Sequence, residues 1–485
     1  MATSLSERQR TQLLAGLALL AVVYLVLAAK EFAASAFAAR SELPKLELAV
    51  HLSPGNADYR HRLGRYFAYV ANDPQSAIQS FQSAVKLNPY DAHYWFDLAA
   101  QYQVAGNIAG QRAALERALK AEPTAPDVAW EAANFFLVDG DIDRALREFH
   151  VVIGNDNSLV DAALQSCWRI RPDANALLRD VVPARTDTLL SFLTLLVSKQ
   201  ETAGAMQTWE HLTQLHEKFE NRYLFDYVRY LINVRRPDAA MSAWEQAAVS
   251  LGLTSYLPTD DNLVVNGDFS LDILNGGFDW TYVNRLGVRP LLDSSDFREG
   301  HRSLSLTFEG PGITDAGVQQ LIPVHGATTY DFSAYYKSAE FEGAGGPEIV
   351  LRDAYTGAPL FASDPLNDAD FWKEVHSKIT TPNSTTLLSL AIERFPSGSP
   401  IRGKLWLNDF QLAPEDSDAA DDDAPATDSH PADLRANEVR TNDSRINDSR
   451  ADDSKKNDMR ASNSRPNDSR SIDSHSNDSH SKDKP

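Results

Sequence analysis

The sequence predicts a multidomain protein in which an all-α helical solenoid is followed by an all-β sandwich, with an N-terminal transmembrane helix and a disordered C-terminal tail. Three observations on the 485-residue chain predict this order. A charge-free apolar run occupies residues 13–29, and helix–turn–helix punctuation recurs at a constant spacing from Ala57 onward. After about Asp261 the pattern changes to short alternating runs separated by Gly, Pro, Asn and Asp, which is typical of antiparallel strands.

The N-terminal residues predict a cytoplasmic end at 1–12 and a membrane segment at 13–34. The run from Leu13 to Ala29 is 17 residues long, the lower limit of about 17 for a membrane span, and it follows Arg8 and Arg10. Two interpretations remain, an uncleaved anchor or a signal peptide cut after Ala34-Ser35-Ala36. The run is longer than a typical signal-peptide core, which favours the anchor. In both cases the bulk of the chain is periplasmic or extracellular, and it is secreted if the segment is cleaved.

Composition excludes several classes of function. The net charge of −21 argues against nucleic-acid binding, because Lys and Arg supply the affinity for phosphates. The single cysteine, Cys167, rules out an intramolecular disulfide, a cysteine-based zinc site and a CxxC redox pair.

Residues 45–255 predict a solenoid of helical repeats. The clearest copy carries Trp95, Leu98, Ala99, Tyr102, the turn Gly106-Asn107, Leu115, Ala118 and Pro123. Pro89 and Pro123 end successive units at the same position, because proline cannot continue a helix. These residues resemble tetratricopeptide (TPR) repeats, whose helix–turn–helix unit has about 34 residues, the separation of the two prolines. The resemblance implies a concave surface that binds a protein partner.

The repeat pattern weakens beyond residue 156. Ala205-Met206-x-x-Trp209 recurs as Ala240-Met241-x-x-Trp244, whereas residues 159–183 fit the period poorly. The number of repeats between 157 and 255 is therefore left open. Five tryptophans occupy repeat positions, and we expect them to pack in the core rather than form a binding stripe: Trp95, Trp130, Trp168, Trp209 and Trp244.

Residues 261–412 predict a sandwich, and about 150 residues are enough for a jelly roll of eight or so strands. The order from NLVVNGDFS (262–270) to the closing GKLWLNDFQL (403–412) resembles the galactose-binding-like jelly rolls of carbohydrate-binding modules found beside xylanases and glucanases. The resemblance implies a β-sandwich that binds glycans without catalysis. Many such modules hold a structural calcium, but Ser270 stands where Glu is common and Asn408 precedes Asp409 where two aspartates are common. We therefore expect no metal.

Exposed aromatic side chains are the candidates for glycan contacts, because their apolar rings stack on pyranose faces. The candidates are Tyr282, Tyr335, Tyr336, Tyr355 and Phe395, with Phe371 as a further aromatic of this kind. Alternation along a strand allows only one of Tyr335 and Tyr336 to face outward. Four further aromatics are expected in the core by the same resemblance: Trp280, Tyr330, Trp372 and Trp406.

Residues 414–485 predict a disordered tail that begins acidic and becomes an array of five-residue units such as TNDSR and INDSR. A five-residue period places no common face on a helix or a strand, and almost no aliphatic residue is present to offset the entropy of ordering. The chain contains no GxSxG, HExxH, GxxxxGK or GxGxxG motif, so we expect no catalytic residue and no cofactor.

These features favour a membrane-tethered, non-enzymatic envelope scaffold whose solenoid binds a protein and whose sandwich binds a polysaccharide. Its parts resemble in kind the TPR proteins that accompany bacterial exopolysaccharide assembly and secretion. The alternatives are an interaction scaffold without glycan binding and, third, an unrecognised glycan-acting enzyme.

Overall fold

The computed structural model describes residues 7–367 and 369–415, so residues 416–485 of the predicted tail lie outside the described residues, whereas Pro414, its first predicted residue, ends the last strand. Fourteen α-helices in these ranges precede one short 3₁₀ helix and ten strands. The helices are α1 Glu7–Ala38, α2 Leu43–Leu52, α3 Ala57–Tyr69, α4 Pro74–Leu87, α5 Ala92–Val104, α6 Ile108–Ala121, α7 Pro126–Val138, α8 Ile142–Asn155, α9 Val160–Ile170, α10 Ala174–Asp180, α11 Thr186–Ser198, α12 Thr202–Gln214, α13 Asn221–Asn233 and α14 Pro237–Leu251. The predicted order of fold classes, helical and then all-β, is confirmed for the described residues.

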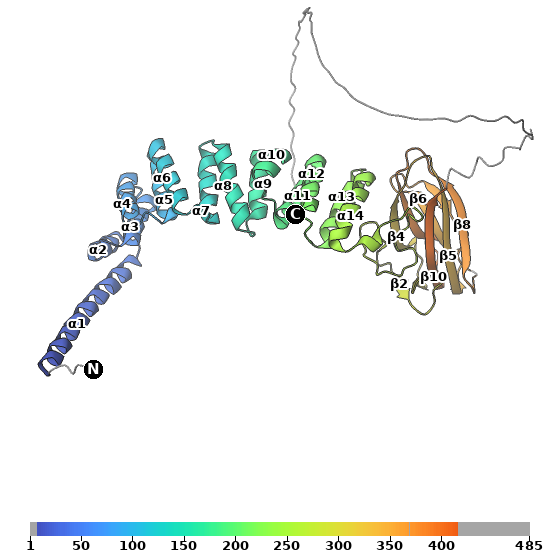
Figure 1. Ribbon diagram of the computed structural model, residues 1–485, viewed down its shortest axis with the longest axis horizontal. Coiled ribbons are helices and arrows are strands. Elements are labelled where there is room, and N and C mark those ends of the chain that lie inside the picture. Colours follow the sequence, from blue (N-terminus) through green and yellow to red (C-terminus); the bar gives the residue numbers. More distant parts are fainter. Residues whose placement is uncertain (1–6, 368, 416–485) are drawn as a thin grey trace, which may run out of the picture. The chain divides into compact units, whose positions relative to one another are not determined.

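Helices α3 to α8 form successive hairpins, visible in Figure 1 as three pairs. Side chains at the starts of the helices accept hydrogen bonds from backbone N–H groups and stabilise these ends, as Asp73 does for α4 and Asn107 for α6. The predicted turn residue Gly106 has a positive φ of 71°. Phe81, Leu115 and Phe149 recur at the interval of the two prolines, and all three are buried. Residues at equivalent positions of the sequence repeat are therefore buried at equivalent positions of successive hairpins.

The poorly fitting stretch between 159 and 183 contains α9 and the seven-residue α10. Pro172 and Pro183 bracket α10, and proline inside a helix removes a hydrogen bond and clashes with the preceding turn. Because α10 is confined to this short stretch, its unit cannot match the period of the earlier hairpins.

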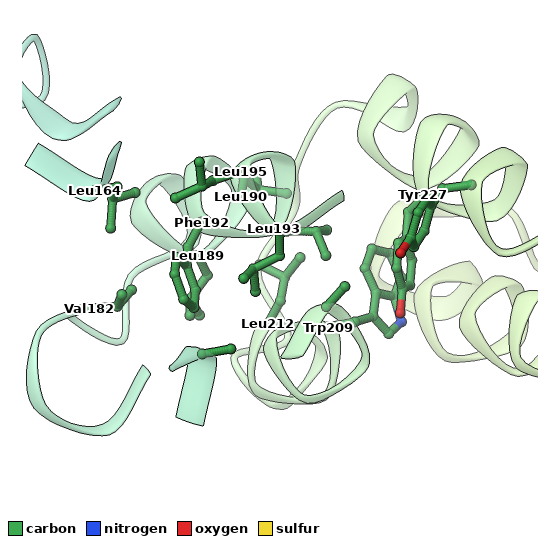
Figure 2. Close-up of a cluster of buried hydrophobic side chains, with 14 of the residues drawn as sticks. Leu164, Val182, Leu189, Leu190, Phe192, Leu193, Leu195, Trp209, Leu212 and Tyr227 are labelled. Carbon is green, nitrogen blue, oxygen red and sulfur yellow. The ribbon is translucent and has the colours of Figure 1, made fainter. Parts of the chain in front are cut away.

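The main core of the helical region runs from α7 to α14 and includes Cys167. Figure 2 shows the part of this core around Phe192, Trp209 and Tyr227. Trp209 and Trp244 are buried there, while Trp130 and Trp168 are half-buried and pack against the same core. Trp95 is half-buried against the preceding core and donates its indole N–H to the carbonyl of Pro89 at 2.9 Å. All five tryptophans pack in the solenoid, as predicted.

Helix α1 is the one helix of the described residues that is long and apolar enough to cross a membrane, and a signal sequence would pass the same test. Its C-terminal part packs against α2 and α3, where Ala34 and Ala38 are buried with Ala49 and Tyr59. The Ser53 hydroxyl also donates to the Glu31 carboxylate at 2.7 Å. The first helices of the solenoid therefore pack directly against the C-terminal part of α1.

The sandwich has two five-stranded antiparallel sheets. The strands are β1 Thr281–Tyr282, β2 Val288–Asp293, β3 Ser303–Glu309, β4 Asp315–Pro323, β5 Thr329–Glu342, β6 Gly346–Asp353, β7 Pro359–Ala362, β8 Lys373–Thr380, β9 Leu387–Phe395 and β10 Arg402–Pro414. The first sheet has the order β1-β4-β9-β6-β7, and the second sheet has the order β2-β3-β10-β5-β8. Their inner faces enclose one core, which includes Trp280, Tyr330 and Phe410.

The last helical hairpin and the sandwich share a junction. The Trp244 indole N–H donates to the carbonyl of Tyr256 at 3.0 Å, and its ring meets Phe278 edge to face with centroids 6.1 Å apart. Gly277 has a φ of 66°, and a Cβ there would lie 1.9 Å from the Trp244 ring. Leu387 of β9 packs in the same core. The apolar face of the last hairpin is therefore covered by the sandwich.

Asp279, in the loop that follows Phe278, carries a buried carboxyl group. One oxygen accepts from the Leu274 N–H at 2.6 Å, while the other has no hydrogen-bond partner among the described residues. Burial raises the pKa of Asp279 from 3.8 to about 6. The folded protein therefore binds this proton more tightly than the unfolded chain does, and ionisation of Asp279 destabilises the fold.

We expect Asp279→Asn to raise the midpoint of thermal unfolding at pH 7.5 and to leave it nearly unchanged at pH 4. A raised pKa in the folded state lowers the free energy of unfolding as the pH rises from about 4 to above about 6, and the amide escapes this loss of about 3 kcal/mol. Calorimetry of both full chains across this pH range measures the difference. An equal gain at pH 4 and pH 7.5 would show that charge burial is not the cause.

Candidate functional site

The five aromatic candidates lie on different parts of the sandwich and do not converge on one site. Tyr282 is on the edge strand β1, Tyr335 and Tyr336 are adjacent on β5, Tyr355 follows β6, and Phe395 ends β9. Whether each of these aromatic rings has a face open to a ligand depends on the groups packed around it.

On β5 the two tyrosines point to opposite faces of the second sheet. Tyr336 packs against the sandwich core, whereas Tyr335 lies on the outer face. The guanidinium carbon of Arg298 is 3.5 Å from the centre of the Tyr335 ring, and Arg298 also pairs with Asp409. This cation occupies the ring face that a sugar would need.

The same outer face holds Trp406 in a network of ion pairs and hydrogen bonds. Its indole N–H donates to Asp293 at 2.9 Å, and the Lys404 ammonium lies 4.3 Å from the ring centre and 3.0 Å from the same carboxylate. Burial alone would raise the pKa of Asp293, but hydrogen bonds from Ser295, Trp406 and Lys404 hold it well below its usual range. The aromatic groups of this face are therefore engaged within the chain.

Of the four aromatics expected in the sandwich core, two are buried and two are not. Trp280 and Tyr330 are buried, as predicted. Trp406 lies on the outer face of the second sheet, and Trp372 is half-buried just before β8, so the expectation of burial was wrong for these two. The alternation of β10 directs Leu405 and Leu407 inward and so turns Trp406 outward.

Tyr355 belongs to the junction with the helices. Its hydroxyl donates to the carbonyl of Ile232 at 3.1 Å, and the Arg235 guanidinium carbon lies 5.1 Å from its ring centre. Leu321 and Leu387, on the outer face of the first sheet, pack against the same helical core. The helices thus cover one end of this face, and Tyr355 is unavailable to a glycan.

The opposite end of the first sheet carries a row of charged residues. Asp315, Glu393 and Glu348 lie side by side on β4, β9 and β6 by strand register. Arg352 binds Glu393 through two hydrogen bonds of 2.8 and 2.7 Å, and Arg285 binds Asp315 at 2.9 and 3.2 Å.

Glu348 is the acid of this row without an arginine bound to it. Burial, followed by the carboxylates of Glu393 and Asp364, raises its pKa. A partly buried carboxyl group in this position can accept or donate a hydrogen bond to a ligand.

Phe395 lies next to this row. Leu388, Leu390 and Ile392 of β9 point into the sandwich core, so Glu393 and Phe395 lie on the outer face. The Phe395 side chain is 62% exposed, and Gly346 is its partner on the neighbouring strand. An exposed ring beside fixed carboxylate and guanidinium groups can stack on an apolar sugar face and bind its hydroxyls.

Sequence reasoning found Phe395 but missed Asp315, Glu348, Arg352 and Glu393. The alternation in LLSLAIERF from Leu387 to Phe395 carries a signal, since charged Glu393 stands two positions before Phe395, on the outward side of a largely apolar strand. Arg352 precedes Glu393 by 41 residues, and only strand pairing brings the two together. No motif in one sequence records that pairing.

The position at which the family resemblance implies a structural calcium is occupied in this chain by the hydrogen-bonded amide of Asn408. Asn408 is buried, and its amide N–H groups donate to the carbonyls of Asp268 and Arg302, both at 2.9 Å. Its side-chain oxygen accepts from the N–H groups of Arg298 and Glu299. The amide thus satisfies carbonyl oxygens that would otherwise be available to bind a metal.

A separate groove of about 720 Å³ lies at the start of the solenoid, between the end of α1 and helices α2, α3 and α5. His61 stacks on Tyr94 with ring centres 4.4 Å apart and bonds Asp97 at 2.7 Å. Arg62, Arg65 and Tyr69 also line it. The groove therefore combines aromatic surface with groups that can bind a polar chain.

Comparison with known proteins adds structural neighbours. No protein-family model and no curated protein matches the chain. A structure described as "CBM4 structure and function" has 19% identity and a TM-score of 0.25, and the match covers 31% of this chain and 99% of that one. The CBM22-1 xylan-binding domain of Paenibacillus barcinonensis Xyn10C has 19% identity and a TM-score of 0.22, covering 32% of this chain and 96% of that one. The crystal structure of MamA has 19% identity and a TM-score of 0.25, and the match covers 33% of this chain and 88% of that one.

We expect Asn408→Asp to lower the midpoint of thermal unfolding by several degrees at pH 7.5. The substitution removes two donated hydrogen bonds and places a carboxylate against the carbonyls of Asp268 and Arg302, and an unsatisfied buried group costs about 1–3 kcal/mol. Calorimetry of the full chain with EDTA measures the loss. An unchanged midpoint would contradict the packing role given to this amide.

Proposed function

We propose that this protein is a membrane-tethered, non-enzymatic envelope scaffold. In this proposal α1 anchors the chain, the solenoid binds a protein partner, and the open end of the first sheet binds a polysaccharide. The observation that carries the glycan part is the exposed Phe395 ring beside the Arg352–Glu393 pair and Glu348.

The contrast between the two sheets supports this choice of face. The outer aromatics of the second sheet are covered by Arg298 and Lys404, and Tyr355 is occupied by α13 and the turn that follows it. Among the described residues, no cation lies over the Phe395 ring and no helix packs on it, and its neighbours Arg352 and Glu393 are held in place by hydrogen bonds. Preorganised polar groups bind a ligand with less loss of conformational entropy.

The groove between α1, α2, α3 and α5 supports the protein-binding part. Solenoids of helical hairpins present extended surfaces of this kind, and His61, Tyr94 and Asp97 are held together at its wall. We extend the proposal to exopolysaccharide assembly or secretion, a setting that would use a glycan-binding part and a protein-binding part on one tether.

A scaffold without glycan binding is the second candidate. The helices already use Leu321, Leu387 and Tyr355 of the first sheet as a contact surface, so the sandwich acts at least partly as a cap on the solenoid. Under this candidate the remaining face of the sheet binds protein.

The contacts of α1 favour an uncleaved anchor. Ala34-Ser35-Ala36, the candidate cleavage point, lies inside the helix, and Ala34 is fully buried against the first hairpin. Removal of residues 1–36 would take away both Ala34 and the Glu31 partner of Ser53.

We therefore expect the mature protein to keep residues 1–36 and to fractionate with membranes after carbonate extraction. Intact mass measurement of the purified chain and blotting of the fractions measure this. A mature chain that starts near residue 37 in the soluble fraction would contradict the tether.

We expect Phe395→Ala to weaken retention of the detergent-solubilised full chain on its preferred polysaccharide at least tenfold, which corresponds to about 1.4 kcal/mol of lost ring contact. Affinity electrophoresis against a panel of xylan, β-glucan, galactan and chitin measures retention. Phe371→Ala is the matched control, since Phe371 is also an exposed phenylalanine but precedes β8 of the second sheet. If the unsubstituted chain binds no polysaccharide, the glycan part is wrong, and equal losses in the two variants would remove Phe395 from the site.

A further inference from the structure

The first three hairpins carry an apolar edge that their own folding does not use. Val70, Val104 and Val138 stand at a constant interval, at or beside the ends of α3, α5 and α7, and are 65%, 67% and 73% exposed. Tyr69, Ile108 and Ile142 at the same turns are exposed as well. We name these six residues the valine edge: Tyr69, Val70, Val104, Ile108, Val138 and Ile142.

The residues of the valine edge occupy equivalent places in neighbouring hairpins. Each valine stands two positions before the turn residue with positive φ, which is Asn72, Gly106 or Gly140. Helix α4 packs against α5, and α6 against α7, so the three turns follow one another along one side of the stack. Buried Phe81, Leu115 and Phe149 keep the same interval as the valines.

The fold does not require an apolar residue at this position. The hairpins α11–α12 and α13–α14 make the same turn with positive φ at Gln200 and Arg235. Two positions earlier they carry Ser198 and Asn233, both exposed and polar. The valine edge is thus specific to the three hairpins nearest to α1, and exposed apolar patches of this kind indicate an interaction surface.

The charges of these turns limit what can cover the edge. Segments 69–75, 103–109 and 137–143 contain four aspartates and no Lys or Arg. Asp73 caps α4, while Asp139, Asp141 and Asp143 pair with Arg112, Arg144 and Arg171 of the same chain. An anionic membrane surface attracts Lys and Arg, which these segments lack, and three of their four aspartates are already paired within the chain, so they offer little to a charged partner. The partner that fits is another apolar edge.

We propose that the valine edge is the contact between two parallel copies of this chain. A second copy carries the same interval, so Val70, Val104 and Val138 of one chain meet their own counterparts about a two-fold axis. The tether places both N-termini in one membrane, which favours the parallel arrangement. It also raises the effective concentration of one valine edge near the other, because both edges lie in the hairpins that follow the membrane helix. This argument uses the anchoring part of the proposed function and is independent of glycan binding.

The test is disulfide crosslinking of Val104→Cys in the full chain within membrane vesicles. Cys167 is buried, and burial raises its pKa to about 12, so the native thiol does not react. We expect oxidation to give at least tenfold more covalent dimer with Val104→Cys than with Ser198→Cys, an exposed residue at the equivalent turn of α11–α12. Equal yields overturn the proposal. Carbonate extraction of the same vesicles reports separately whether the tether itself holds.

A second measurement separates the copy from the bilayer as occupant. Val104→Asn together with Val138→Asn is expected to weaken the dimer at least tenfold in sedimentation of the detergent-solubilised chain, with an unchanged circular dichroism spectrum because both side chains are exposed. An unchanged dimer overturns the proposal. The proposal is also overturned if the Val104→Cys chain stays monomeric in vesicles and its new thiol is shielded there from a water-soluble maleimide, because the bilayer then covers the edge.

Discussion

A helical hairpin of this chain has an apolar face on either side, and each face needs a neighbour to exclude water from it. Inside the stack the neighbour is the next hairpin, as at the contacts of α4 with α5 and α8 with α9. At the two ends of the stack there is no further hairpin, so another part of the chain must cover the apolar face. Here the C-terminal part of α1 covers the first hairpin through Ala34 and Ala38, and the loop at Phe278 with Leu387 of β9 covers the last. This requirement for end covers, general in solenoids, explains why α1 and the sandwich are both packed against the helical hairpins.

The same requirement shapes what the sandwich can do. Because the sandwich covers α14, one end of its first sheet, including Leu321 and Tyr355, is packed against the helices and is not available to a ligand. On the second sheet the outward aromatic rings are covered by cations of the sandwich itself. Lys404 lies over Trp406 and Arg298 lies over Tyr335, so neither ring is open to a ligand. Tyr282 on β1 and Phe371 before β8 are also exposed, but the end of the first sheet with Phe395 is where an exposed ring lies beside the fixed Arg352–Glu393 pair. The candidate site is thus defined as much by occupied surfaces as by suitable residues.

Local sequence signals predicted most of the architecture. Periodicity found the helices and strands, and Pro89, Pro123 and Gly106 marked the ends and turns correctly because their backbone preferences act on neighbouring residues. The same signals failed where partners are distant. Trp406 was expected in the core from the resemblance, yet alternation about Leu405 and Leu407 turns it outward. The Arg352–Glu393 pair was not foreseen, because the register of β6 with β9 brings these two residues together.

By itself, the sequence determined the order of an apolar helix, helical hairpins and a β-sandwich, since these depend on the spacing of apolar, small and turn residues along short stretches. It also determined the repeat of the valine edge, whose three valines stand at a constant interval. Only the tertiary structure decided which side chains of the sandwich are open and which are covered. Cover comes from residues far apart in the chain, as Ile232 for Tyr355 and Arg298 for Tyr335. A free ring face is therefore a property of packing, and a single sequence does not specify which distant groups will pack against it.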